Sequence, residues 1–274
     1  MMGEWSQNTV KLPSGIEQFY TRTGSGDKPT LLLAHGFSDQ GTCWHQLAGE
    51  LEADYDIIMY DAYGHGKSSR VDPNQRFDLV EDMHDLVVAL ALDKPGIIGH
   101  SMGAATAAVF ASRYPDMLSC LVLEDPPWSD DVMSAEETKT MMENWKGYHL
   151  KTQTKSLPEL IAWQKKTSPN WEEAILPQWA EGKLAMDITI FDHFKTPSED
   201  WREVAQAIQV PTLIITGDND RGAIVKPSLG VEAVELLAHG EFGHISHAGH
   251  CVRYEQFQAY LTMVKLFLKR NLKG

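Results

Sequence analysis

The chain has 274 residues, of which 43% are hydrophobic and 23% charged, which is typical of a globular protein with a sizeable buried core. Its net charge of −14 argues against nucleic acid or an anionic membrane surface as a partner, because both need a positive surface. Three cysteines are too few for a disulfide framework, and neither a signal peptide nor an apolar run of membrane-spanning length is visible, so we expect a cytoplasmic protein.

Apolar runs of strand length alternate with segments of helical spacing, which is the pattern of a parallel sheet covered by helices. The chain begins with a hairpin-like segment over residues 10–20. Further strands are expected at residues 30–34, 56–60, 96–99, 119–123, 208–216 and 243–246. Helices are expected at residues 77–92, 104–114 and 254–272.

Between Asp125 and about Ser198 this alternation stops and the chain reads as purely helical. Ser134 fits a capping box before one helix, and Ser156 fits the cap of a second. Five of the eight Trp residues of the chain lie here, namely Trp128, Trp145, Trp163, Trp171 and Trp179. Such side chains form either a small core of their own or the roof of an apolar pocket. The candidates for the pocket wall are Trp128, Met141 and Trp145.

The pentapeptide Gly99-His100-Ser101-Met102-Gly103 lies between a predicted strand and a predicted helix. It has the G-x-S-x-G pattern of a nucleophile elbow, a tight turn that holds serine in a strained backbone conformation. Gly99 and Gly103 leave room for the strand and the helix to meet without a clash. Ser101 would lie near the N-terminus of the helix, where the dipole stabilises a developing oxyanion. The pattern makes Ser101 the candidate nucleophile.

A second motif, His35-Gly36, directly follows an apolar strand. Acyl transfer needs two backbone N–H groups that point at the oxygen of the tetrahedral intermediate. One would come from Met102, the residue after the nucleophile, and the other from Phe37, in the loop after His35-Gly36. The alternative is that His35-Gly36 is an ordinary turn with a structural histidine.

With these motifs the chain resembles the α/β-hydrolase superfamily over nearly its whole length. Residues 61–68 are similar to the superfamily's D-x-R-G-x-G-x-S loop, with Tyr63 in place of the usual Arg, and Trp44 lies where many members carry Trp. The resemblance implies an α/β fold, with a mostly parallel sheet flanked by helices and a helical cap inserted after the sixth strand. We therefore expect one fold with a core of residues 1–125 and 199–274 and a cap of residues 126–198.

A serine hydroxyl becomes a good nucleophile when an imidazole accepts its proton, and that imidazole needs a carboxylate to orient it. The resemblance implies that the acid follows the seventh strand in a G-x-x-D turn, which Gly217-Asp218-Asn219-Asp220 supplies. The spacing selects Asp220, with Asp218 one turn position early. Asp125, after the sixth strand, is the second possibility, since some members place the acid there.

Four histidines crowd the segment that should hold the base: His239, His244, His247 and His250. In the family a short strand and a small Gly-containing turn precede the histidine, and a helix follows it. Residues 245–250 match this order, so His250 is the predicted base, with His244 second. We expect no metal site, because the spacing would place successive histidines on opposite faces of a strand and no zinc-type Cys or carboxylate pattern accompanies them.

These motifs predict a serine hydrolase for a small, largely apolar acyl substrate, an esterase or lactonase. Ser101 would attack the carbonyl, His250 would take its proton and Asp220 would orient His250, with no cofactor or metal. A serine at the elbow argues against dehalogenases and epoxide hydrolases, whose ester intermediate needs Asp there. Carbon–carbon bond hydrolysis, amide hydrolysis and perhydrolysis with the same triad stay open, and a non-catalytic ligand-binding receptor is the alternative of a different class.

Overall fold

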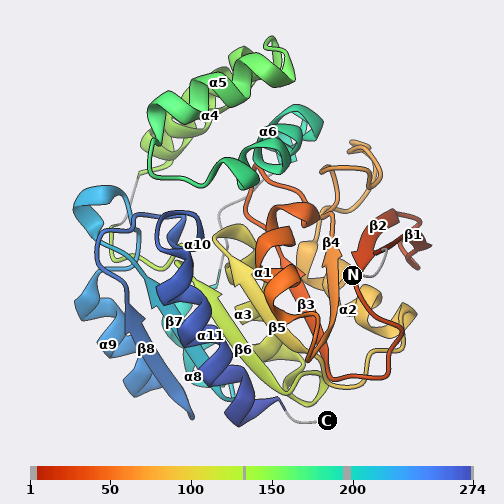
Figure 1. Ribbon diagram of the computed structural model, residues 1–274, viewed down its shortest axis with the longest axis vertical. Helices are drawn as coiled ribbons and strands as arrows, with labels where there is room; N and C mark the ends of the chain where they lie inside the picture. Colours follow the sequence, from red (N-terminus) through yellow and green to blue (C-terminus); the bar gives the residue numbers. More distant parts are fainter. Residues whose placement is uncertain (1–4, 132–133, 194–198, 273–274) are drawn as a thin grey trace.

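One eight-stranded sheet forms the centre of the computed structural model, which describes residues 5–131, 134–193 and 199–272 (Figure 1). Strands β3 to β8 are parallel to their neighbours, while β1 pairs with β2, and β2 with β4, in antiparallel orientation. This confirms the predicted mostly parallel sheet. Across the sheet the strands are β1 (Ser6–Lys11), β2 (Glu17–Arg22), β4 (Asp56–Tyr60), β3 (Thr30–Ala34), β5 (Gly96–His100), β6 (Cys120–Glu124), β7 (Thr212–Thr216) and β8 (Gly240–His244).

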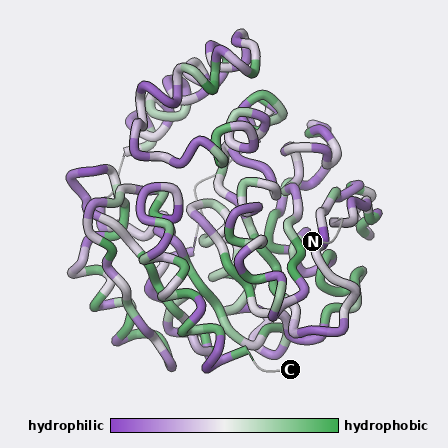
Figure 2. The backbone as a smooth tube through the Cα atoms, viewed as in Figure 1, coloured by the Kyte–Doolittle hydropathy of each residue, from purple (hydrophilic) through white to green (hydrophobic). Residues whose placement is uncertain are grey.

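The central strands separate two hydrophobic cores. Strands β4, β5, β6 and β7 are buried at every residue, and Figure 2 shows hydrophobic residues following the strands at the centre of the fold. Because successive side chains of a strand point to opposite faces, Leu31 and Leu32 belong to different cores. Helices α2 (Leu79–Ala89), α3 (Met102–Arg113), α8 (Trp201–Ala207) and α9 (Pro227–Leu236) cover the face of Leu32, and α1 (His45–Leu51), α10 (Val252–Glu255) and α11 (Phe257–Asn271) cover the face of Leu31.

Two predicted boundaries at the C-terminal end of the chain are wrong. The strand expected at residues 243–246 is β8, which runs from Gly240 to His244 because it pairs along the whole of β7. The single helix expected at residues 254–272 is divided into α10 and α11. Gln256 separates them with a non-helical backbone, φ −138° and ψ 56°, which a helix does not accommodate.

Besides α8, the described part of the chain between β6 and β7 forms four α-helices, which gather over one end of the sheet (Figure 1). These are α4 (Ala135–Gln153), α5 (Leu157–Thr167), α6 (Leu176–Ala185) and α7 (Ile190–His193). The capping box predicted at Ser134 and the helix cap predicted at Ser156 are confirmed. Both form capping boxes in the structure, in which Glu137 and Glu159 accept the backbone N–H of Ser134 and Ser156. The division into a core and a cap of residues 126–198 stays a prediction. In the described part of the chain, no helix has the length and hydropathy that a membrane span requires.

A buried carboxylic acid in α2 faces the core instead of solvent. Asp82 is 5% exposed, and its Oδ2 atom has no hydrogen-bond partner within the described structure. Burial, together with the nearby charges of Asp78 and Asp85, raises the pKa of Asp82 to about 7. Since the unfolded chain releases this proton near pH 4, the folded state binds one more proton between about pH 4 and pH 7. The free energy of unfolding therefore falls as the pH rises through this window.

Asp82→Asn is expected to remove this pH dependence. At pH 8 the variant should be more stable than the parent by roughly 2–4 kcal/mol, because the parent must hold a buried charge, and the difference should shrink toward pH 4. Urea denaturation at several pH values measures it. Asp93→Asn, at an exposed position after α2, is the control and should change the stability little at any pH. An Asp82→Asn effect that does not vary with pH would contradict the assignment.

Candidate active site

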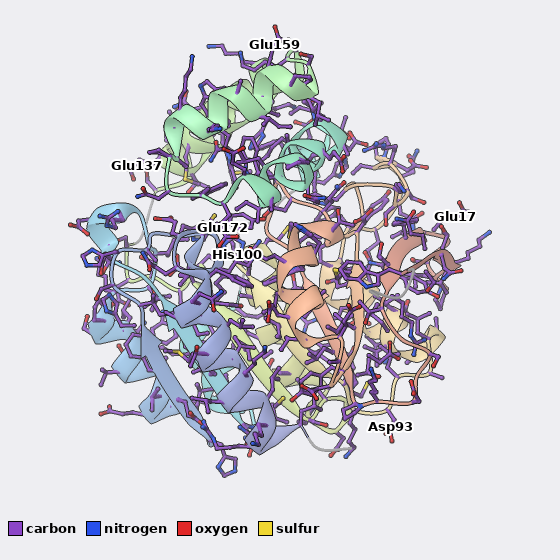
Figure 3. The ribbon with its side chains drawn as sticks, in the orientation of Figure 1. Glu17, Asp93, His100, Glu137, Glu159 and Glu172 are labelled. Carbon is purple, nitrogen blue, oxygen red and sulfur yellow. The ribbon has the colours of Figure 1, made fainter. Side chains whose placement is uncertain are left out.

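The sharp turn between β5 and α3 holds Ser101 at φ 51° and ψ −114°. Both glycines of the motif are required, because a Cβ at Gly99 would come 2.5 Å from the carbonyl oxygen of Gly103, and a Cβ at Gly103 would come 2.3 Å from that of Ala34. A positive φ at a non-glycine residue costs conformational energy and persists where the surroundings enforce it. The predicted strand, elbow and helix are thus confirmed. His100, the last residue of β5, lies below the helices that carry Glu137 and Glu159 (Figure 3).

His250 pairs with a buried carboxylate at the same end of the sheet. Its Nδ1 atom lies 2.6 Å from Oδ2 of Asp125, which is fully buried. The Asp125 carboxylate also accepts hydrogen bonds from Thr216 Oγ1 at 2.8 Å and from the backbone N–H groups of Ile224 and Val225 at 2.8 and 3.0 Å. These donors satisfy an anion that burial would otherwise destabilise. Ser101 and His250 line the same cavity.

The predicted pairing of Asp220 with His250 is wrong. Asp220 is exposed in a short 3₁₀ helix, Asn219–Arg221, and Asp125 occupies the position beside His250. The reason is strand register: His100 pairs with Glu124, so the residues that follow, Ser101 and Asp125, leave β5 and β6 at the same level. The signal available in the sequence was that Asp125 follows its apolar strand as directly as Ser101 follows its own.

The second candidate base, His244, belongs to a surface cluster. Its Nε2 atom lies 3.0 Å from Oδ1 of Asp218, and Asp218 also accepts a hydrogen bond of 2.8 Å from the backbone N–H of His247. Both histidines are exposed. No group of three or more side chains suited to a metal ion occurs among the described residues.

His35 fixes the plane of the peptide that joins Gly36 to Phe37. Its Nε2 accepts the N–H of Ala62 at 2.9 Å, so Nδ1 carries the proton and donates it to the Gly36 carbonyl at 2.8 Å. Burial lowers the pKa of His35 to about 3, which keeps the ring neutral. The Gly36 carbonyl also accepts the N–H of Asp39 at 3.0 Å. Because the peptide is trans, the N–H of Phe37 points opposite to this carbonyl.

Gly36 itself leaves space that a side chain would fill. A Cβ at this position would come 2.7 Å from Nδ1 of His100. Gly36, Phe37 and Met102 all line the cavity that Ser101 and His250 line. The His35-Gly36 motif therefore shapes the backbone beside the elbow, and His35 acts through hydrogen bonds to that backbone.

The cavity has a volume of about 1110 Å³ and a largely apolar wall. It is lined by Phe37, Phe77, Leu79, Val80, Met102, Val109, Met141, Met142, Trp145, Trp179, Ile224 and Tyr254, among others. Of the three predicted wall residues, Met141 and Trp145 lie here, and the Trp145 ring packs 4.4 Å from that of Phe37. Helices α4 and α6 thus supply part of the wall.

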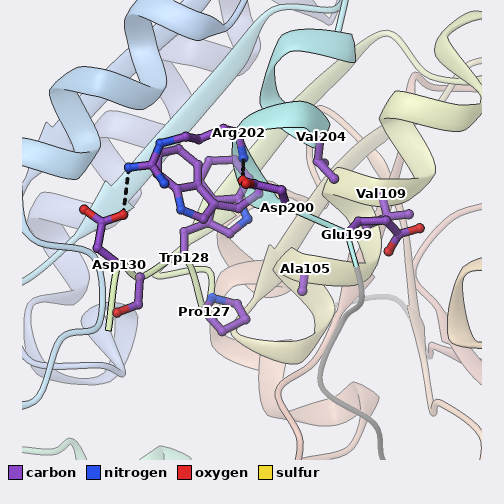
Figure 4. A pocket seen from close by; sticks show the side chains of 11 residues that line it. Ala105, Val109, Pro127, Trp128, Asp130, Glu199, Asp200, Arg202 and Val204 are labelled. Atoms are coloured by element: carbon purple, nitrogen blue, oxygen red, sulfur yellow. Dashed lines mark hydrogen bonds and ion pairs between the residues drawn. The ribbon is translucent and has the colours of Figure 1, made fainter. Parts of the chain in front are cut away.

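Trp128 lies elsewhere, in a smaller pocket of about 320 Å³ shown in Figure 4. Its ring stacks on Trp201 with centroids 5.3 Å apart, and the guanidinium of Arg202 lies 4.4 Å from the Trp201 ring centroid. The two pockets share part of their lining: Ala105, Val109, Pro127, Ser129 and Glu199. Trp128 thus contributes to the hydrophobic core and to a pocket beside the main cavity rather than to its wall.

The comparisons with known proteins agree with this fold. A family model described as alpha/beta hydrolase fold matches residues 29–256. Epoxide hydrolase 1 of Caenorhabditis elegans is 23% identical over 97% of this chain and 71% of its own, and lipase 3 of a Moraxella species is 25% identical over 94% and 83%. Among solved structures, an esterase from Exiguobacterium antarcticum is similar with a TM-score of 0.76 at 18% identity, covering 96% of this chain and 100% of that one.

Proposed function

The chain belongs to the alpha/beta hydrolase fold family, and we propose that it is a serine hydrolase that cleaves a carboxylic ester or lactone through an acyl-enzyme on Ser101. The observation that carries the proposal is the cavity that Ser101, at its positive-φ elbow, shares with His250, whose ring is held by Asp125. The similarity to a lipase along most of both chains supports the same class of reaction.

The reaction proceeds in two steps. The Oγ atom of Ser101 attacks the substrate carbonyl carbon and transfers its proton to Nε2 of His250, because Nδ1 is engaged with Asp125. His250 then protonates the departing alkoxide, which leaves as the alcohol of an ester or, when a lactone opens, stays on the acyl chain as a hydroxyl group. The acyl group stays on Ser101. Water, deprotonated by His250, attacks the acyl-enzyme and releases the carboxylic acid and the free Ser101 hydroxyl. Asp125 holds the ring and stabilises its charged form in both steps.

The backbone N–H groups of Phe37 and Met102 stabilise the oxyanion. The peptide plane that His35 and Asp39 fix through the Gly36 carbonyl supports the role of Phe37. Met102 is the first residue of α3, so its N–H lies at the positive end of a twelve-residue helix. Donors fixed in advance need no reorganisation as charge develops on the oxygen.

The size and lining of the cavity favour an apolar substrate with at least one bulky group. Ligand pockets commonly measure about 300–1,000 Å³, and the cavity here, at about 1110 Å³, lies above that range. We therefore propose a substrate whose acyl or alcohol group is larger than that of the small ester predicted from the sequence. Hydrolysis rates are measured for a panel of p-nitrophenyl esters of rising chain length and for lactones, amides and diketones. The substrate that is cleaved fastest identifies the type of bond and distinguishes an esterase or lactonase from an amidase or a carbon–carbon bond hydrolase.

The candidate nucleophile separates this proposal from epoxide hydrolysis. The Caenorhabditis elegans relative is an epoxide hydrolase. The ester intermediate of epoxide hydrolases needs Asp at the elbow, where this chain has Ser101. A non-catalytic receptor is the alternative of a different class, and the hydrogen bonds that orient His250 and Asp125 argue against it.

Ser101→Ala tests the nucleophile. A fluorophosphonate probe should label the parent protein covalently and leave the variant unlabelled, because the probe reacts with an activated serine hydroxyl. Intact-protein mass spectrometry measures the labelling, and peptide mapping locates it. A folded parent protein that is not labelled would refute the serine hydrolase.

Asp125→Asn and Asp220→Asn form a matched pair for the acid. Asp125→Asn should lower kcat roughly 10³-fold or more, because the amide cannot stabilise the imidazolium of His250. Asp220→Asn, at an exposed position, should change kcat less than about two-fold. Ester hydrolysis under saturating substrate measures both, and equal losses would contradict the role of Asp125.

His250→Ala and His244→Ala distinguish the two candidate bases. His250→Ala should abolish measurable turnover, because Ser101 then has no proton acceptor. His244→Ala should keep at least about half of the activity, because His244 pairs with Asp218 on the surface. The assay is hydrolysis of a p-nitrophenyl ester by protein with an unchanged circular dichroism spectrum. The reverse ranking would assign the base to His244.

A further inference from the structure

A buried ion pair joins helix α6 to the loop after β3. Nζ of Lys183 lies 2.8 Å from Oδ1 of Asp39, and the two side chains are 10% and 5% exposed. The same ammonium donates to the carbonyl oxygen of Ser38 at 3.0 Å and to its Oγ at 2.6 Å. An ammonium has three N–H donors, and all three are engaged with this loop. Lys183 lines the cavity, but it has no donor left for a substrate carboxylate.

Asp39 links Lys183 to the peptide bond between Gly36 and Phe37. Its backbone N–H donates to the carbonyl oxygen of Gly36 at 3.0 Å, and the N–H on the other side of that peptide belongs to Phe37. On its far side, Oδ2 of Asp39 lies 3.7 Å from Nη2 of Arg253. Burial alone would raise the pKa of Asp39, but the charges of Lys183 and Arg253 hold it below its usual value. Asp39 is therefore a carboxylate held between two cations.

Helix α6 packs directly on the loop at this point. A Cβ at Gly182 would come within 3.2 Å of the backbone of Asp39 and Gln40, tighter than an ordinary van der Waals contact. One turn earlier, the ring of Trp179 lies 5.4 Å from the Lys183 ammonium. The absence of a side chain at Gly182 thus sets the distance at which Lys183 reaches Ser38 and Asp39.

We propose that Lys183 is a positioning residue for the reaction, which ties α6 to the loop of residues 36–39 and thereby holds the Phe37 N–H toward the oxyanion. The inference rests on the proposed function, because the loop matters to catalysis only if Phe37 stabilises a tetrahedral intermediate. The helices inserted between β6 and β7 then set the geometry of the oxyanion hole as well as the shape of the cavity. Lys183 acts through Ser38 and Asp39 and does not contact the reacting atoms.

The test removes both charges of the pair together. Lys183→Met alone would leave Asp39 buried with too little compensating charge, which costs several kcal/mol and risks unfolding. The double variant Lys183→Met/Asp39→Asn keeps the site neutral, since Glu124 still balances Arg253. We expect kcat for an ester to fall about 10- to 100-fold with KM changed less than about three-fold, because an oxyanion contact forms only in the transition state. An aryl boronic acid, which forms a tetrahedral adduct with serine, should lose affinity by a similar factor.

A second variant needs no charge change. Gly182→Ala should displace α6 from the loop by a few tenths of an ångström and lower kcat several-fold, because small misplacements near a reacting centre are costly. Gly147→Ala, on α4 with open space around it, is its matched control and should leave kcat unchanged. Glu172→Gln is the control for the ion pair. Glu172 lies in the connection before α6 and accepts a hydrogen bond of 2.7 Å from Gln46 of α1, away from the loop of residues 36–39.

Hydrogen–deuterium exchange of a peptide covering residues 36–40 gives a readout that does not depend on turnover. The amides should exchange faster in the double variant than in the parent or in Glu172→Gln. Unchanged exchange, unchanged kcat in the folded double variant, or a raised KM at constant kcat would each overturn the inference. Failure of the proposed function is a separate outcome, namely a parent protein that neither hydrolyses esters nor reacts with the fluorophosphonate probe.

Discussion

Strands β5 and β6 run parallel in a register that pairs His100 with Glu124, and the arrangement of the site depends on this pairing. The next residue of each strand, Ser101 and Asp125, leaves the sheet at a positive φ, 51° and 42°. Their side chains therefore start from neighbouring points at one edge of the sheet. A one-residue slip of the register would move every side chain of a strand to the opposite core, so hydrophobic burial on both faces opposes it. The position of the candidate nucleophile relative to the acid follows from the packing of the sheet.

A buried charge network holds the segment that carries His250. Arg253, three residues after His250, donates from its backbone N–H and from its guanidinium to the carboxylate of Glu124, each at 2.9 Å. Its guanidinium lies 4.1 and 4.3 Å from the ring centroids of Trp44 and Tyr254. Removing one partner of a buried ion pair is strongly destabilising. The segment that carries His250 is thus fastened to the end of β6, one residue before the acid that binds the imidazole.

The helices between β6 and β7 divide into an anchored part and a loosely packed part. Helix α6 is joined to the loop after β3 through Lys183 and packs against α5 around Trp179. Helix α4, although nineteen residues long, buries only His149 and Thr152 fully, and Met141 on it is 43% exposed. Segments with few buried contacts open at low free-energy cost. We therefore expect the wall formed by α4 to adapt to the size of the substrate more readily than the wall formed by α6.

Local sequence determined the parallel sheet, the elbow at Ser101 and the capping of the helices at Ser134 and Ser156. These features depend on periodicity, on glycines that sterics require and on side chains that bond to their own backbone, and such rules operate within a few residues. Tertiary structure alone decided that Asp125, not Asp220, pairs with His250. Asp125 and His250 are 125 positions apart in the chain, and strand register together with hydrogen-bond donors from a distant turn brings them into contact. No local pattern in the chain encodes that contact.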